Sequence, residues 1–402
     1  MVTVPLCVYR LGVIAPTMNS STSRVCNTSD RPRLRSSVQR WHRLLVVVPL
    51  LVSTLLTGFQ AEARVDPLTC VSRLTPSVQV GQLLLPLTGN VAEVSDSVRL
   101  GLVTGLAPTG TVTRQEAATI RRLRAETLPL GILVASDEEG GLVQRYRRVI
   151  GPLPDAATIA ATLTPEEASA TYDTYARALR SWGVDIVFAP VLDVGGGPGI
   201  GSRSFSSDFR AVTIYGRAAA MAFRSAGLVP VFKHFPGHGS ASRDTHLGIA
   251  STARLERLRQ KDLRPYQLLR EFPDAGVMIG HLVVPGTTNG RPATMSVPII
   301  RGLLRESLGF NGLVFSDALG MTAISGTYSD VEAAVAFLNA GGDVIVTSSL
   351  QSALRLNVAL RSQLRDGKLS STVVARVAAR VLQAKGIDVC AVPSARQSRG
   401  NP

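Results

Sequence analysis

The sequence predicts an α/β protein that folds as one (β/α)8 barrel of the TIM type. Short β-branched segments alternate with helical patterns from about residue 80 to residue 385, and this alternation indicates a parallel sheet covered by helices. Seven or eight such units in about 310 residues suit a closed barrel. Polar residues end most of the predicted strands, and a barrel gathers such positions around one mouth. An open, doubly wound sheet is the alternative, but it would concentrate function near one switch point.

The strands are predicted from short runs bounded by turn residues. The runs Ile132–Ala135 and Val344–Thr347 are nearly all apolar or β-branched, as in parallel strands buried on both faces. The expected strands are 82–87, 132–137, 186–194, 229–235, 276–281, 313–317 and 343–348.

Helical patterns lie between these strands. The clearest start is at Thr164, because Glu167 follows three residues later, which is the spacing of a capping box. The expected helices are 113–127, 165–181, 208–226, 297–308, 329–340 and 350–365.

The first 63 residues have the pattern of an export signal. Arg40 and Arg43 precede an apolar run, 44–56, and Ala61-Glu62-Ala63 provides a small-x-small cleavage pattern. The run of about 13 residues is shorter than the roughly 20 that span a membrane, which favours cleavage near Ala63 over an uncleaved anchor. We therefore expect a secreted or cell-envelope protein, with 1–63 as an extension, 64–390 as the barrel and 391–402 as a disordered tail.

Cysteine usage agrees with export. Cys7 and Cys26 fall in the predicted extension, so Cys70 and Cys390 remain, one at each end of the barrel. In an oxidising compartment these two could form a disulfide, and two unpaired thiols are the alternative.

The formal net charge of +14 is strongly basic. A solvated basic surface, or attraction to an anionic polymer such as a cell wall, accounts for this charge. No basic stretch is interleaved with aromatic residues, which disfavours a nucleic-acid partner. We expect a monomer.

Titratable residues are densest between Lys233 and His246. They follow an apolar run and surround Pro and Gly residues, and such groups on a loop at a strand end commonly form a working site. Asp244 and His246 are two residues apart and would face the same side of an extended segment. A carboxylate beside an imidazole stabilises imidazolium, so the histidine could act as acid and then as base. A zinc site of His234, His238, Asp244 and His246 is the alternative.

Other predicted strand ends add charged side chains. Asp317 ends the strand 313–317 and could be a nucleophile, a metal ligand or a structural cap. The acids 137–139 could coordinate a hard cation or hold sugar hydroxyls. Arg145 and Arg203 could bring positive charge to the same mouth.

Six motifs in this order resemble glycoside hydrolase family 3, specifically its single-domain β-N-acetylglucosaminidases of the NagZ type. The resemblance covers about residues 75–385. The motifs are Asp137-Glu-Glu-Gly-Gly-Leu-Val-Gln-Arg145, Phe188-Ala-Pro-Val-Leu-Asp-Val194, Ile200-Gly-Ser-Arg-Ser-Phe205, Lys233-His-Phe-Pro-Gly-His-Gly239, Asp244-Thr-His246 and Ser316-Asp-Ala-Leu-Gly-Met321.

The resemblance implies a role for each matching residue. Asp317 would be the nucleophile that forms a glycosyl-enzyme intermediate, and His246, paired with Asp244, would be the acid/base. Residues expected to bind N-acetylglucosamine are Asp137, Arg145, Arg203, Lys233, His234 and Met321. The implied reaction is retaining hydrolysis of terminal N-acetylglucosamine from cell-wall fragments or related glycosides, without metal or organic cofactor.

The chain departs from the family pattern at several positions. The family commonly has Gln, Arg and Asp where this chain has Glu138, Leu142 and Ala318. Phosphorolysis and β-glucosidase activity are alternatives within the family. A zinc metallohydrolase and a non-catalytic wall-binding protein are alternatives from other classes.

Overall fold

The computed structural model describes residues 66–126 and 128–392. The predicted export signal lies outside these residues, as does nearly all of the predicted tail. Among the helices that are described, none has the length and apolarity needed to cross a bilayer.

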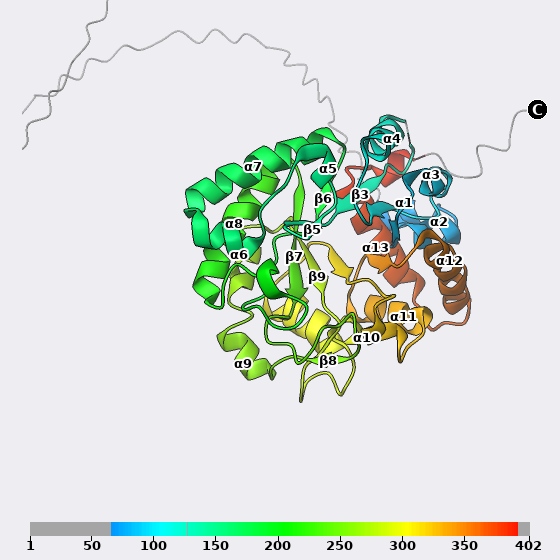
Figure 1. Cartoon of the computed structure of the whole chain (residues 1–402). Helices are drawn as coiled ribbons and strands as arrows, with labels where there is room; N and C mark the ends of the chain where they lie inside the picture. The colour runs from blue at the N-terminus through cyan, green and yellow to red at the C-terminus, as the bar shows by residue number, and fades with distance from the viewer. Residues whose placement is uncertain (1–65, 127, 393–402) are drawn as a thin grey trace, which may run out of the picture. The chain divides into compact units, whose positions relative to one another are not determined.

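Within the described residues, eight parallel strands form the central sheet (Figure 1). β12 pairs with β1, and a bridge between Phe315 and Val344 joins β11 to the segment before β12, so the sheet closes on itself. This confirms the barrel and rules out the open sheet. Around the barrel the strands are β1 (Leu84–Thr88), β2 (Gly105–Pro108), β3 (Leu133–Ser136), β6 (Ile186–Val187), β7 (Val229–Phe235), β9 (Gly276–Ile279), β11 (Val314–Ser316) and β12 (Ile345–Thr347).

The predicted strands are present, but most of them are shorter than expected. The prediction 229–235 coincides with β7, whereas 186–194 shrinks to β6. After β6 the Ala189–Pro190 peptide is cis, and Val191 makes only an isolated bridge to Lys233. β2 was not predicted, because its sequence Gly-Leu-Ala-Pro contains two residues that are rare inside strands.

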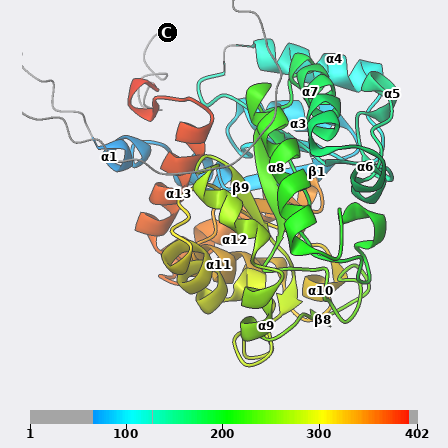
Figure 2. The same ribbon diagram turned by 90° about the vertical axis from the view of Figure 1, so that its left-hand side faces the viewer.

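Helices cover the outside of the barrel (Figures 1 and 2). The predicted capping box is confirmed, because the Glu167 N–H donates to Thr164 Oγ1 at 3.3 Å and the Thr164 N–H donates to Glu167 Oε2 at 2.8 Å. The predicted helices are α4 (Arg114–Ala125), α7 (Pro165–Ser181), α8 (Phe209–Ser225), the π-helix η4 (Pro298–Ser307), α11 (Asp330–Ala340) and α12 (Leu350–Arg365).

Several elements were not predicted, and most of them are short. The additional helices are α1 (Pro67–Val71), α2 (Pro76–Gly81), α3 (Val91–Arg99), α5 (Arg147–Ile150), α6 (Ala156–Thr162), α9 (Leu255–Gln260), α10 (Thr322–Ser325) and α13 (Ser371–Ala384). The remaining short strands and 3-10 helices are β4 (Glu138–Gly140), β5 (Val143–Gln144), β8 (Ala250–Ser251), β10 (Leu282–Val283), η1 (Gly201–Arg203), η2 (Pro265–Arg270), η3 (Ala293–Met295) and η5 (Val389–Ala391).

A disulfide joins Cys70 of α1 to Cys390 of η5, with the two Cα atoms 5.0 Å apart. The predicted pairing of the two barrel ends is therefore confirmed. The apolar core fills the barrel and the layer between strands and helices, and Leu85, Val134 and Phe315 are fully buried there. The polar residues described next lie at the carboxyl ends of the strands.

Candidate active site

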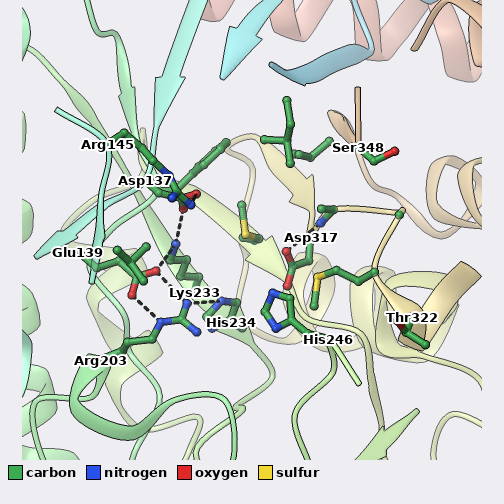
Figure 3. A pocket seen from close by; sticks show the side chains of 18 residues that line it. Asp137, Glu139, Arg145, Arg203, Lys233, His234, His246, Asp317, Thr322 and Ser348 are labelled. Atoms are coloured by element: carbon green, nitrogen blue, oxygen red, sulfur yellow. Dashed lines mark hydrogen bonds and ion pairs between the residues drawn. The ribbon is translucent and has the colours of Figure 1, made fainter. Parts of the chain in front are cut away.

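A cavity of about 460 Å³ lies at the carboxyl ends of the barrel strands (Figure 3). It collects eight of the nine residues predicted to act on or bind the substrate. The ninth, Asp244, lies behind His246 and lines a neighbouring cavity instead. The eight are Asp137, Arg145, Arg203, Lys233, His234, His246, Asp317 and Met321.

One wall of the cavity is a network of ion pairs, which we call the buried clamp: Asp137, Glu139, Arg145, Arg203 and Lys233. Lys233 Nζ lies 2.8 Å from Asp137 Oδ1 and 2.6 Å from Glu139 Oε1. Arg203 binds Glu139 through two nitrogens, at 2.7 and 2.8 Å, and Arg145 Nη2 lies 3.1 Å from Asp137 Oδ2. Three cations thus face two carboxylates, which leaves the clamp with one surplus positive charge.

The clamp groups keep their charges because they are paired. Burial alone would raise the pKa of Asp137, but Lys233 and Arg145 outweigh it and hold that pKa below its usual range. The pKa of Glu139 is lowered in the same way by Lys233 and Arg203. Burial opposes the charge of Lys233, yet Asp137 and Glu139 raise its pKa. The clamp therefore offers fixed, charged hydrogen-bonding groups to the cavity.

Glu138 lies between two clamp carboxylates in sequence but faces the other way, because neighbouring residues of a strand alternate. Its Oε1 accepts from Ser136 Oγ at 2.6 Å and from the Tyr146 N–H at 3.2 Å, and its Oε2 accepts from Tyr175 Oη at 2.6 Å. No cation pairs with it among the described residues, and burial raises its pKa to about 7. The acids 137–139 therefore do not converge on a hard cation.

Asp193 orients His234, which also lines the cavity. Asp193 is fully buried, and its Oδ2 lies 2.7 Å from His234 Nδ1, while its Oδ1 accepts from the His238 N–H at 2.5 Å. This leaves His234 Nε2 facing Arg203 at 3.4 Å.

Sequence reasoning named Glu139 only within the acids 137–139, without a role of its own, and did not include Asp193 among the site residues. A signal existed for both. Asp193 falls in the predicted strand 186–194, and Glu139 is two residues from Asp137, the spacing that puts both on one side of a strand.

Asp244 and His246 form a pair on the loop that follows β7. His246 Nδ1 lies 2.8 Å from Asp244 Oδ1, which also accepts from the His246 N–H at 2.9 Å. Partial burial would raise the pKa of Asp244, but these two hydrogen bonds outweigh it and lower that pKa. The His246 side chain is 62% exposed and also lines the cavity, so its Nε2 is left for a ligand.

Asp317 directly follows β11 and points into the same cavity as His246 (Figure 3). Its Oδ1 accepts from the Ala318 N–H at 2.8 Å, and no Lys or Arg forms an ion pair with it within the described residues. Burial would raise the pKa of Asp317, but His281, His234 and the Ala318 N–H outweigh it and lower that pKa. Asp317 is therefore an ionised carboxylate without a blocking cation, as a nucleophile requires.

A second cavity of about 580 Å³ adjoins the first and shares Val143, Arg203 and His246 with it. Its other walls are Leu142 with its neighbours and the glycine-rich segment 197–202. His246 therefore stands where the two cavities meet.

The three histidines of the alternative zinc site do not converge, and two of them have partners outside that set. His234 binds Asp193, His238 Nε2 lies 3.0 Å from Thr245 Oγ1, and His246 binds Asp244. In the part of the chain that the structure describes, no three His, Cys, Asp or Glu side chains are placed to hold a metal ion. The zinc arrangement is therefore not formed by these residues.

Known proteins share this architecture. Beta-hexosaminidase LpqI of Mycobacterium tuberculosis is 41% identical over 268 residues, which are 64% of this chain and 69% of that protein. A beta-hexosaminidase of Xylella fastidiosa is 38% identical over 229 residues, 55% of this chain and 68% of that protein. The solved structure of M. tuberculosis LpqI has a TM-score of 0.75 at 36% identity, covering 80% of this chain and 97% of that one. A β-N-acetylglucosaminidase from Thermotoga maritima has a TM-score of 0.69 at 28% identity, covering 77% and 68%.

The family model "Glycosyl hydrolase family 3 N terminal domain" matches residues 76–384, which contain the whole cavity described above. The protein is therefore a glycoside hydrolase, and the chain belongs to glycosyl hydrolase family 3.

Proposed function

We propose that this glycoside hydrolase is a retaining exo-β-N-acetylglucosaminidase that removes terminal N-acetylglucosamine from cell-wall fragments or related glycosides. The relatives named beta-hexosaminidase and β-N-acetylglucosaminidase support the choice of sugar. The observation that carries the proposal is the single cavity that is lined by an ionised Asp317 and by His246, which Asp244 contacts from behind, with the buried clamp as one wall.

In the first step, an Asp317 oxygen attacks the anomeric carbon while His246, as imidazolium, donates its Nε2 proton to the glycosidic oxygen. The bond between the anomeric carbon and that oxygen breaks, and the leaving group departs as a neutral alcohol. Asp244 Oδ1, 2.8 Å from Nδ1, holds the ring so that Nε2 is left to face the substrate.

In the second step, neutral His246 takes a proton from a water molecule, whose oxygen attacks the anomeric carbon. The bond to Asp317 breaks and the carboxylate is restored. Two successive inversions give net retention. A histidine suits this exchange, because it alternates between neutral and cationic forms near neutral pH and adds no second negative charge beside Asp317.

The buried clamp is proposed to hold the hydroxyl groups of the sugar. Asp137 supplies acceptor oxygens, and Arg145, Arg203 and Lys233 supply donors, while His234 adds a ring nitrogen that Asp193 orients. Met321 lines the same cavity and would contact an apolar face of the ring. Ion pairing fixes these groups before substrate arrives, so little reorganisation is needed on binding.

The second cavity is proposed to receive the leaving group. It meets the first at His246, where the proton must be delivered, and its glycine-rich wall leaves room for a bulky leaving group. The first cavity ends at the buried clamp, which favours cleavage from a chain end over cleavage within a chain.

We also propose that residues 64–390 form the catalytic domain of an exported monomer that requires no cofactor. The Cys70–Cys390 disulfide supports an oxidising compartment.

The test is release of 4-nitrophenol from 4-nitrophenyl β-N-acetylglucosaminide by the wild type and by Asp317→Ala, each with and without EDTA and phosphate. We expect EDTA-resistant turnover by the wild type and a loss of at least about 10³-fold in the variant. Proton NMR during hydrolysis should show the β-anomer of the free sugar first.

Other outcomes would redirect the proposal. The α-anomer first would contradict the covalent intermediate, and acceleration by phosphate would favour phosphorolysis. If 4-nitrophenyl β-glucoside were turned over faster than the N-acetylglucosaminide, the preferred sugar would be glucose. No turnover of either glycoside by folded wild type would favour a binding protein.

A further inference from the structure

The mouth of the barrel is electrically uneven. The segment 243–264, which follows β7 and contains His246, has six Lys or Arg residues. The segment 306–354, which includes the loops after β11 and β12, has no Lys or Arg. We call the cations of the first segment the basic rim: Arg243, Arg254, Arg257, Arg259, Lys261 and Arg264.

The basic rim is not neutralised from within. None of its side chains forms an ion pair with a carboxylate among the described residues. The segment holds three acids, but Asp244 is bound to His246, and Asp262 is fully buried with its pKa raised by burial to about 6. Glu256 is left as the exposed carboxylate.

The rim follows one edge of the mouth. Arg254 lies at the start of α9, and its Nη1 is 3.3 Å from where a Cβ on Gly286 would stand. Lys261 lies just past the end of α9, and its Nζ is 3.7 Å from the equivalent point on Gly195. α9 therefore carries positive charge from the loop after β10 to the glycine-rich loop. Figures 1 and 2 both place α9 at the same end of the barrel as β8 and α10.

We propose that the basic rim is a docking surface for a linear polyanion, a polymer with phosphate or carboxylate groups at intervals. Single exposed ion pairs are weak, so one small anion would bind poorly. Several unpaired cations within about a Debye length of 8–10 Å act together on a chain that carries many charges. A polymer bound to the rim would lie beside the mouth of the barrel.

The composition of the rim disfavours two other polyanionic partners. The segment 243–264 contains no Phe, Tyr or Trp on which bases could stack, as single-stranded nucleic acid requires. α9 also lacks an outward apolar face for a membrane, since Leu258 is fully buried and Leu255 packs against the core. Leu247 and Ile249 are exposed, but they are two residues on a loop.

The experiment measures binding of the full-length protein to long-chain polyphosphate and to polygalacturonate, at low and at high NaCl, with dextran as the uncharged polymer. The variant is Arg254→Gln/Arg257→Gln/Arg259→Gln. The matched control is Arg122→Gln/Arg365→Gln/Arg376→Gln, which removes the same charge from exposed sites on α4, α12 and α13. Phosphate and carboxylate polymers are separate arms, so the preferred anion is identified.

We expect salt-sensitive binding of at least one polyanion, weakened about tenfold in the rim variant, because each exposed pair contributes a factor of roughly 1.5 to 5. The control should change binding less than twofold, and both variants should turn over the small nitrophenyl glycoside like the wild type. Equal weakening by variant and control, or binding unaffected by salt, would overturn the proposal. So would binding confined to vesicles of phosphatidylglycerol or to single-stranded DNA. Because binding is measured without turnover, its failure is distinguishable from failure of the proposed function.

Discussion

The buried clamp and the acid/base loop, which is the segment after β7 that carries Asp244 and His246, contribute to the same cavity but are built in opposite ways. Lys233 and Glu139 of the clamp are almost fully buried and lie 2.6 Å apart, in β7 and β4. His246 stands on a loop, 62% exposed, with Asp244 as its partner. Groups that hold a sugar gain from being fixed in advance. An acid/base group must also meet water in the second step, so exposure is compatible with its proposed role.

The first prediction tests whether the clamp supports the fold as well as the site. Lys233→Met removes the cation shared by Asp137 and Glu139 and leaves two buried carboxylates close together. Removing one partner of a buried pair typically costs about 3–5 kcal/mol of unfolding free energy, and because Asp137 keeps Arg145 and Glu139 keeps Arg203 we expect the lower end of this range. We expect a large fall in melting temperature as well as loss of turnover.

The matched control is Lys368→Met, which changes the same residue type at an exposed position. It should melt and turn over like the wild type. If Lys233→Met melted like this control, the clamp would not be the stabilising element that the comparison assumes.

The second prediction concerns the exposed half of the comparison. His246→Ala should lower kcat/KM for an alkyl β-N-acetylglucosaminide by about 10²–10⁴-fold, the usual contribution of general acid–base catalysis. The deficit should be smaller with a nitrophenyl leaving group, which departs without a proton. The melting temperature should not change, because the side chain is exposed.

Asp244→Asn is the companion variant. It keeps the shape of the side chain but removes the negative charge 2.8 Å from His246 Nδ1, so the rate with the alkyl glycoside should fall. Equal deficits for alkyl and nitrophenyl substrates in His246→Ala would contradict the assignment of His246 as the proton donor.

The fold was easier to predict than these contacts. The alternation of apolar strand segments with helical patterns predicted the barrel and six of its longer helices, because each of these signals is local in sequence. The ion pair of Glu139 with Lys233 joins residues from different strands, and it depends on which strands are neighbours and how they are staggered. The resemblance to a family identified Lys233, but no local pattern indicated that Glu139 would bind it.

The same limit applies to Asp193. It orients His234 and holds the His238 backbone at the start of the acid/base loop, and both contacts cross from the β6 segment to the β7 segment. β2 was missed for another reason, since Gly and Pro in a run of four residues hide the strand signal.

The third prediction concerns Glu138, the buried carboxyl group that faces away from the clamp. The pKa of Glu138 is about 7 in the folded protein, above the ordinary value of 4.5. Between these values the unfolded chain loses its proton while the folded protein keeps it, so stability falls as pH rises through this window. Asp137 has the opposite sign, since its lowered pKa gives stability that is lost on acidification.

Glu138→Gln removes the contribution of Glu138 to the pH dependence of stability. Relative to wild type, the variant should gain up to about 3 kcal/mol of unfolding free energy between pH 5 and pH 8. Chemical unfolding at both pH values measures it, and Glu306→Gln, at an exposed position, is the control. A difference between Glu138→Gln and wild type that stays constant with pH would show that Glu138 does not hold a proton in the folded state.

The smallest expected effect tests where the proposed sugar site ends and the proposed leaving-group side begins. Leu142 is 97% exposed and lines the second cavity, in the turn that joins the clamp residue Glu139 to Arg145. Leu142→Ala should change stability by less than about 0.5 kcal/mol, as exposed substitutions usually do. If the second cavity receives the leaving group, KM should rise about two- to fivefold for a disaccharide and stay unchanged for a nitrophenyl glycoside, because only the larger leaving group can cover this side chain. A rise in KM for both substrates would place Leu142 against the terminal sugar instead. The buried sugar site would then extend further out of the barrel than the two cavities indicate.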